Sequence, residues 1–201
     1  MPDFEEEREL PWPREGDEVF APGDDWWMNA CVNWGGGWLL YVMGYKNAAD
    51  VLVARVADDR GEADALVYPI VFCFRQYLEL LLKDTLKEAR RYHGVDGSFD
   101  NAHPLLHHWR PLRPLLEKRW PDHPGPLDAV EENLSQFDAV DRGSFAFRYS
   151  VTTTGDQSLP REMQHINLRN LKEVVERIGT FLESCGEALR YEREAADETF
   201  E

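Results

Sequence analysis

The chain has 201 residues, the length of one ordinary domain with room for a sizeable core. Its formal net charge is −16, concentrated at the ends: residues 1–25 carry −8 and residues 183–201 carry −5, which leaves −3 for the body. A charge of this sign excludes tight non-specific binding of nucleic acid by the chain as a whole. We interpret the acidic ends as solvated tails; the alternative is an acidic arm that docks on a basic partner or shields a basic groove.

The cysteines and the amino terminus indicate the cell compartment in which the protein is expected. Cys31, Cys73 and Cys185 show neither a metal-ligand nor a disulfide spacing, as is typical of a reduced cytosolic protein. The amino terminus lacks the basic and apolar regions of a signal peptide, and no run approaches the roughly eighteen apolar residues of a membrane span. The sequence therefore predicts a cytoplasmic protein that is not inserted in a membrane.

The chain is expected to form one helical domain over residues 26–192. Residues 1–25 are acidic and contain four prolines, which is typical of an extended lead-in, and residues 193–201 form an acidic tail. Within the domain, apolar residues recur at threes and fours, the pattern of amphipathic helices. The fold class predicted is all-α, an antiparallel bundle of about five helices.

The helices are expected at residues 38–56, 62–91, from 103 onward, 127–140 and 168–192. Pro69 predicts a kink or a break of the second helix near Val67. The third helix is expected to begin at His103, because Pro104 suits the first helical position, where its missing N–H costs nothing.

A long connection at residues 141–166 separates the last two predicted helices. It is rich in Ser, Thr, Gly and aromatic residues, and residues 144–154 alternate well enough to form a short strand or hairpin. Arg148 in this segment is expected to pair with Asp138 or Asp141; the alternative is contact with a phosphate. Connections of this length in compact domains are commonly functional or bind a partner.

A narrow polar stripe crosses the second predicted helix. Arg75, Glu79 and Lys83 are each four residues apart, so they share one face of a helix that is otherwise apolar from Val71 to Leu82. Such a helix needs neighbours around most of its circumference, and its charges need partners. We interpret the stripe as a buried ion-pair ladder; the functional alternative is a binding site in which Arg75 or Lys83 holds a phosphate.

Several short motifs follow one another along the body of the chain. Arg75-Gln76-x-x-Glu79-Leu80-x-Leu82-Lys83 precedes a loop, then come His103-x-Leu105 with Trp109, and Phe147-Arg148-Tyr149 before the last helix. In this order, residues 40–185 resemble the HEPN (higher eukaryotes and prokaryotes nucleotide-binding) superfamily. The resemblance implies an antiparallel helical bundle, often a homodimer, found in toxin–antitoxin pairs, phage-defence systems and CRISPR effectors.

The resemblance also implies that ribonuclease activity is a candidate function. Many proteins of that superfamily are metal-independent ribonucleases, in which an Arg followed by four to six residues and a His forms a composite site across a dimer. A guanidinium can neutralise the phosphorane while an imidazole moves protons. This chain lacks that spacing, since Arg119 and His123, like Arg161 and His165, are separated by three residues. The candidates for an off-pattern catalytic site are His165, Arg161, Arg148 and His103.

Two histidines of the third predicted helix have a spacing that can bind a metal ion. His103 and His107 are four residues apart, a separation that can bind Zn²⁺ on one helix face, and Asp100 lies just upstream. Neither an HExxH glutamate nor an obvious third ligand accompanies them. The sequence therefore predicts a capping or core-facing His103, with no metal and no cofactor.

The basic residues of the chain are concentrated at residues 83–119, where eight basic residues face five acids in an acidic protein. This local excess can form a modest RNA-facing patch. Two hypotheses follow. The first is a HEPN-like module of a conflict, defence or toxin–antitoxin system that acts through homodimerisation or a partner protein and is not an efficient ribonuclease alone. The second is a divergent metal-independent endoribonuclease.

Overall fold

The computed structural model describes residues 12–13, 15–33, 35, 37–97 and 100–199. The chain divides into two units, residues 1–35 and residues 36–201. In the described part of the first unit, the one helical element is a 3₁₀ turn, η1, at Trp26–Met28. Next to it, the Asn29 side chain accepts a hydrogen bond from the Gly23 N–H (2.8 Å) and donates one to the Gly23 carbonyl (2.7 Å).

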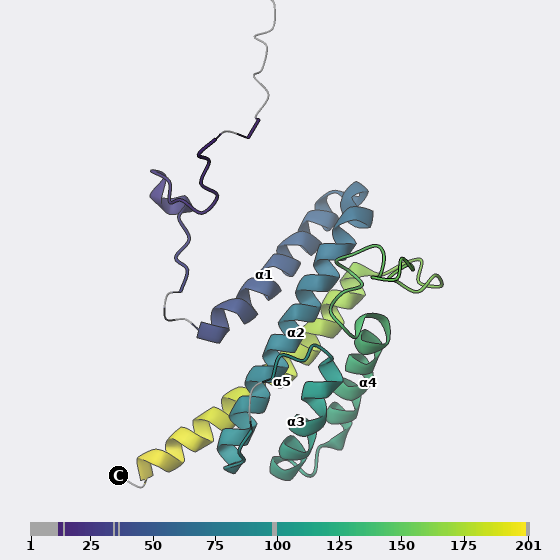
Figure 1. The fold of residues 1–201 in the computed structure, drawn as a ribbon. Coiled ribbons are helices and arrows are strands. Elements are labelled where there is room, and N and C mark those ends of the chain that lie inside the picture. Colours follow the sequence, from purple (N-terminus) through teal and green to yellow (C-terminus); the bar gives the residue numbers. More distant parts are fainter. Residues whose placement is uncertain (1–11, 14, 34, 36, 98–99, 200–201) are drawn as a thin grey trace, which may run out of the picture. The chain divides into compact units, whose positions relative to one another are not determined.

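The second unit is a bundle of helices, which confirms the all-α prediction (Figure 1). Its described elements are α1 (Gly37–Asp58), a 3₁₀ turn η2 (Arg60–Glu62), α2 (Ala63–His93), α3 (Leu105–Arg119), α4 (Pro124–Asp141) and α5 (Leu168–Thr199). The five α-helices correspond to the five expected from the apolar periodicity. Residues 193–199, expected to be part of a tail, continue α5.

The limits of α2 and α3 have local causes. The α2 helix continues through Pro69, so the helix is not broken near Val67. It ends at Gly94, whose φ of 62° favours glycine and whose N–H bonds to the last-turn carbonyls. The α3 helix begins at Leu105 rather than at His103, since Pro104 occupies the cap position. His103 and His107 therefore do not share one helix face.

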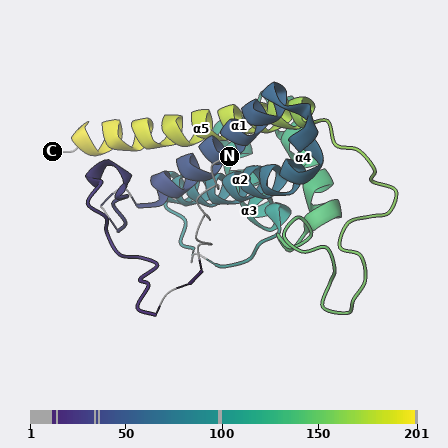
Figure 2. The same cartoon turned by 90° about the horizontal axis from the view of Figure 1, so that it is seen from above.

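The core forms around α2, which packs against α1, α3 and α5, while α3 pairs with α4 (Figures 1 and 2). Its largest buried apolar side chains include Phe74, Tyr77, Leu78, Trp109 and Leu134. The Tyr77 hydroxyl donates to Glu183 on α5 at 2.9 Å. A Cβ added to Gly179 of α5 would lie 2.2 Å from the Tyr77 oxygen, so the two helices approach closely there because that position is glycine.

One helical segment, Arg60–His93, is long and apolar enough by length and composition to cross a membrane. Of its apolar window, 56% is buried inside the protein. Burial against α1, α3 and α5 accounts for this apolarity, as it does for the central helix of any helical bundle.

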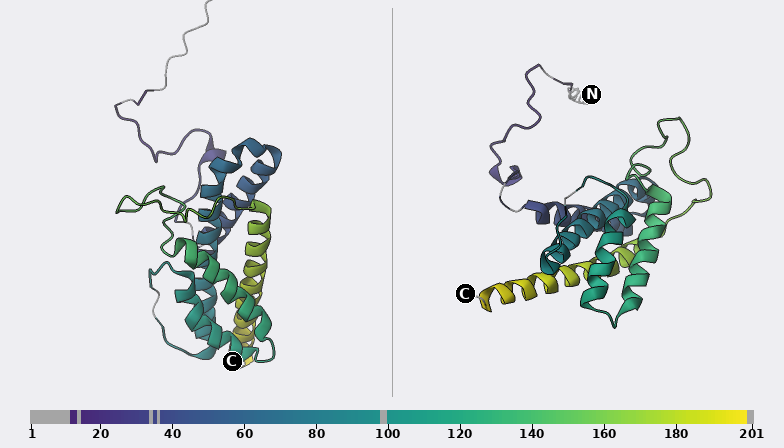
Figure 3. Two further views of the ribbon diagram at one scale, coloured as in Figure 1. Left: turned by 90° about the vertical axis from the view of Figure 1, so that its right-hand side faces the viewer. Right: turned by 60° about the horizontal axis from the view of Figure 1, so that its bottom comes forward.

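The connection between α4 and α5 runs as a long loop beside the helices (Figures 2 and 3). Its described regular structure is a single antiparallel bridge between Val151 and Gln157, rather than the strand or hairpin that the alternation favoured. The alternating aromatic residues are instead in a turn, where the Arg148 and Tyr149 N–H groups both bond to the Phe145 carbonyl.

Candidate functional site

The polar stripe of α2 is a buried cluster of ion pairs, as the spacing predicted. Arg75 is 0% exposed and lies 3.1 Å from Glu79, and Lys83, 8% exposed, lies 2.8 Å from the other Glu79 oxygen. The Nδ1 atom of His103 is 3.3 Å from the same Glu79 carboxylate. Glu79 therefore stands among three potential cations, in a place where an unpaired charge is costly.

Arg75 also joins three segments of the backbone. Its guanidinium donates to the main-chain carbonyls of Asp141 (2.9 Å), His103 (2.8 Å) and Arg142 (3.2 Å). These bonds connect α2 to the end of α4 and to the residue before the α3 cap. Because the guanidinium makes these bonds and is 0% exposed, it holds the bundle together and is not accessible to a ligand.

The two aspartates near the end of α4 bind backbone N–H groups. Asp138 accepts from the Leu105 and Leu106 N–H groups at 2.8 and 2.9 Å, which caps the first turn of α3. Asp141 accepts from the Phe145 and Ala146 N–H groups. The expectation that Arg148 pairs with one of these aspartates is therefore wrong.

Arg148 instead makes local contacts. Its Nε donates to the Ser144 carbonyl at 2.6 Å, and its guanidinium lies 5.5 Å from the centre of the Phe72 ring. A cation over an aromatic face is stabilised by the ring quadrupole. This contact attaches the start of the long connection to α2.

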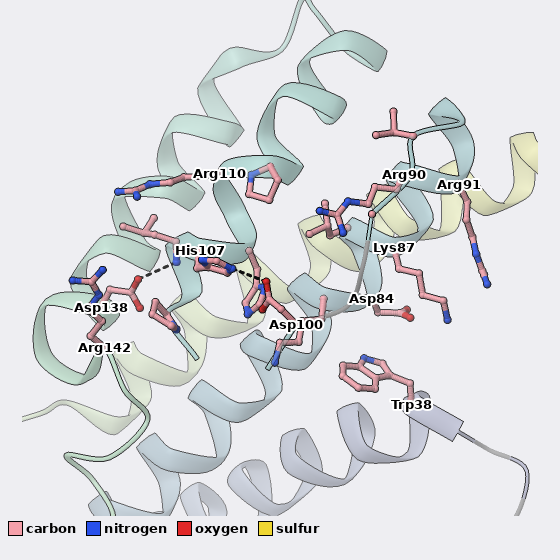
Figure 4. A pocket seen from close by; sticks show the side chains of 18 of the residues that line it. Trp38, Asp84, Lys87, Arg90, Arg91, Asp100, His107, Arg110, Asp138 and Arg142 are labelled. Atoms are coloured by element: carbon pink, nitrogen blue, oxygen red, sulfur yellow. Dashed lines mark hydrogen bonds and ion pairs between the residues drawn. The ribbon is translucent and has the colours of Figure 1, made fainter. Parts of the chain in front are cut away.

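A basic cavity of about 1250 Å³ opens where the second half of α2, the start of α3 and the end of α4 meet (Figure 4). Among the described residues that line it are six cations and four acids: Lys83, Lys87, Arg90, Arg91, Arg110 and Arg142, and Asp84, Asp96, Asp100 and Asp138. In the view of Figure 4, Arg110 and Arg142 lie on one side of the cavity, and Lys87 and Arg90 on the other. Asp100 and His107 lie between them.

Three of these cations are exposed and form no ion pair with any described residue: Lys87, Arg110 and Arg142. Others are engaged, since Lys83 pairs with Glu79 and Arg91 lies 2.9 Å from Glu88. The three exposed cations come from different helix segments, so the positive lining is produced by packing. A guanidinium or ammonium group without a carboxylate partner is available to an anion.

Two histidines and an aspartate form one wall of the cavity. The Nε2 atom of His107 lies 2.7 Å from Asp100, an interaction that lowers the pKa of the Asp100 carboxyl. The Nε2 atom of His108 lies 2.8 Å from the Ala102 carbonyl, and burial lowers the pKa of His108 below its ordinary value. His108 is therefore held as the neutral imidazole.

The four catalytic candidates are placed in different surroundings. His103 faces Glu79, Arg148 contacts Phe72, and Arg161 is exposed in the long connection. His165 lines a second cavity of about 1020 Å³, formed with α1, α2 and the start of α5. No hydrogen bond or ion pair between described residues joins any two of the four.

The sequence missed part of the cavity. Lys87 and Arg110 belong to the basic segment, whereas Arg142 lies outside that segment and lines the cavity from the end of α4. Nothing in the local sequence around Arg142 signals a cavity, because its position depends on how α4 packs on α3. Comparisons with protein-family models, curated proteins and solved structures give no match.

Proposed function

We propose that this chain is a HEPN-like helical module that binds RNA phosphates in the basic cavity and acts within an assembly of a conflict, defence or toxin–antitoxin system. One observation carries the RNA-binding part: Lys87, Arg110 and Arg142 line a single cavity, and none forms an ion pair with a described residue. The motif resemblance is the support for the biological setting.

The arrangement of these cations suits a ligand with more than one phosphate. Arg110 and Arg142 lie on the opposite side of the cavity from Lys87 in Figure 4, so successive phosphates of one strand can meet different cations. Binding through about three phosphates makes the logarithm of affinity fall with the logarithm of salt concentration with a slope near −2 for a single strand. The net charge of −16 opposes contacts elsewhere on the surface.

Fluorescence anisotropy with labelled single-stranded RNA at several salt concentrations tests the proposal. Arg110→Ala combined with Arg142→Ala is expected to weaken binding and to reduce the salt slope by about 0.7 for each phosphate that is no longer neutralised. Lys118→Ala is the matched control, since Lys118 is an exposed cation on the same helix as Arg110 and does not line the cavity. Equal weakening by the control, or no RNA binding by the unmodified chain, would contradict the proposal.

The assembly part is supported by the outer face of α1. Its exposed large apolar residues are Leu39, Leu40, Tyr41, Met43 and Val51, with Leu39 62% and Val51 67% exposed. The ionised groups of residues 37–51 are Lys46 and Asp50, which pair with each other at 2.7 Å. We assign this face to a second copy of the chain, because a neutral apolar face can meet its own copy without bringing like charges together.

Light scattering on the purified chain tests the dimer. The unmodified chain is expected to be a dimer, and Leu40→Asp with Val51→Asp is expected to give a folded monomer. Tyr191→Asp is the control, because Tyr191 is also exposed, at 75%, but lies on α5. A strict monomer at all concentrations would refute this assignment and leave the RNA-binding proposal standing.

A further inference from the structure

Asp100, His107 and His108 bring three potential metal-ligand atoms within 4.8 Å of one another on the wall of the basic cavity. Asp100 lies in the connection between α2 and α3, and the two histidines lie in the first turns of α3. We propose that this cluster is a Zn²⁺ site. It differs from the pair that the sequence suggested, because His108 takes the place of His103.

The ligand types and their spacing fit this ion. Two imidazole nitrogens and one carboxylate oxygen form a donor set typical of zinc sites that keep an open position. Two ligands of a tetrahedral Zn²⁺ ion lie about 3.4 Å apart. The present separations, 2.7 Å between His107 and Asp100 and up to 4.8 Å within the cluster, bracket that value. Metal binding would therefore require rotations of the side chains that bring the three ligand atoms to this spacing.

The backbone of one residue, Ala102, holds two of the three ligands. The Ala102 N–H donates to Asp100 at 2.9 Å, and the Ala102 carbonyl accepts from Nε2 of His108 at 2.8 Å. When Nε2 carries the proton in that bond, Nδ1 of His108 bears the lone pair that binds a metal. Hydrogen bonds of this kind orient metal ligands in known sites and raise their basicity.

The burial of the three ligands leaves a place for a further ligand. His108 is 3% exposed, whereas the side chains of Asp100 and His107 are each 50% exposed. The ion would therefore be held from the protein side and would face the cavity. A water molecule or an anion can complete the coordination from there.

The cations around the cavity do not prevent metal binding. Lys83, next to the cluster, is neutralised by Glu79 at 2.8 Å, and Asp84 and Asp96 also line the cavity. The remaining positive charge of Lys87, Arg110 and Arg142 favours an anionic fourth ligand. The site thus deepens the proposed function, on which this step rests: a phosphate oxygen of RNA would bind the metal while the arginines hold its other oxygens.

Isothermal titration calorimetry with Zn²⁺ in the absence of RNA tests the site. A Cys31→Ser background removes the exposed thiol as a competing ligand. One Zn²⁺ per chain is expected to bind, and His107→Ala and Asp100→Ala are each expected to weaken binding by at least about tenfold. Co²⁺ is expected to give the visible absorption bands of a tetrahedral complex, and these bands should disappear in both variants.

Two controls and two contrary outcomes complete the experiment. His123→Ala, at an exposed histidine outside the cavity, should leave Zn²⁺ binding unchanged, and so should His103→Ala, which separates this cluster from the pair suggested by the sequence. No saturable heat from the parent protein, or binding that survives both ligand substitutions in variants with native circular dichroism, would overturn the site. RNA anisotropy without metal reports separately on the proposed function, so either proposal can fail while the other holds.

Discussion

Removal of the Glu79 carboxylate is the sharpest test of how the bundle is held together. Glu79→Gln keeps the shape of the side chain and removes the negative charge that faces Arg75, Lys83 and His103. Arg75 would then be a buried cation whose remaining ion-pair partner is the Asp141 carboxylate, 3.9 Å away, and Lys83 would lose its ion pair with Glu79. Removing one partner of a buried pair costs about 3–5 kcal/mol.

We expect the unfolding free energy of Glu79→Gln to fall by at least about 3 kcal/mol. In urea this corresponds to a decrease of the midpoint of roughly 1.5 M, for a slope of about 2 kcal/mol per molar. The measurement is equilibrium denaturation followed by circular dichroism. Adding Lys83→Met removes one of the cations that faced Glu79 and is expected to restore part of the stability.

Glu173→Gln is the matched control, because Glu173 makes the same kind of i,i+4 pair on α5 at 3.9 Å but is 55% exposed. A pair of that kind contributes about 0–1 kcal/mol. If Glu79→Gln costs no more than this control, the reasoning that the stripe is an essential buried charge cluster is refuted.

Three further predictions concern the packing and capping of the helices. Gly179→Ala is expected to lower the unfolding free energy by about 1–3 kcal/mol, because its Cβ would overlap the Tyr77 hydroxyl; combining it with Tyr77→Phe should recover part of that stability in the same denaturation assay. Asp138→Ala removes the acceptor for the first two N–H groups of α3 and should lower the unfolding free energy by about 1–2 kcal/mol. Asp122→Ala, at an exposed aspartate between α3 and α4, should lower it little, and equal losses would contradict the capping role. Burial raises the pKa of the Cys185 thiol to about 11, so fewer thiolates form at pH 8 and iodoacetamide should modify exposed Cys31 first and Cys185 last, as mass spectrometry can measure; equal rates in the native protein would contradict the burial.

Much of the fold could be predicted from the sequence because its causes are local. The recurrence of apolar residues at threes and fours places α1, α2, α4 and α5 within a few residues of their observed limits at all but the carboxyl end of α5. The spacing of Arg75, Glu79 and Lys83 predicts their ion pairs, since side chains four residues apart meet on any helix. These inferences need no knowledge of what packs against the helix.

The local rules failed where two interactions compete for the same group. Arg148 and Asp141 lie close in the sequence, but one oxygen of the Asp141 carboxylate accepts two backbone N–H groups of the turn that follows it, and Arg148 contacts Phe72 instead. His103 precedes α3 by two residues, so the four-residue spacing to His107 does not place the two side chains on one helix face. In the first case the backbone N–H groups of a turn decide the outcome, and in the second the position at which α3 begins decides it.

An all-helical bundle, a central helix with paired charges, and a basic segment in an acidic chain all follow from the order of the amino acids. Only the tertiary structure shows that Arg75 donates hydrogen bonds to carbonyls of two distant segments. It also shows that one cavity is lined by three cations, Lys87, Arg110 and Arg142, and by Asp100, His107 and His108. The difference arises because periodicity determines which residues share a face of one helix. Which faces of different helices are in contact depends on how the whole core packs. The candidate site lies where such contacts bring residues of different helices together.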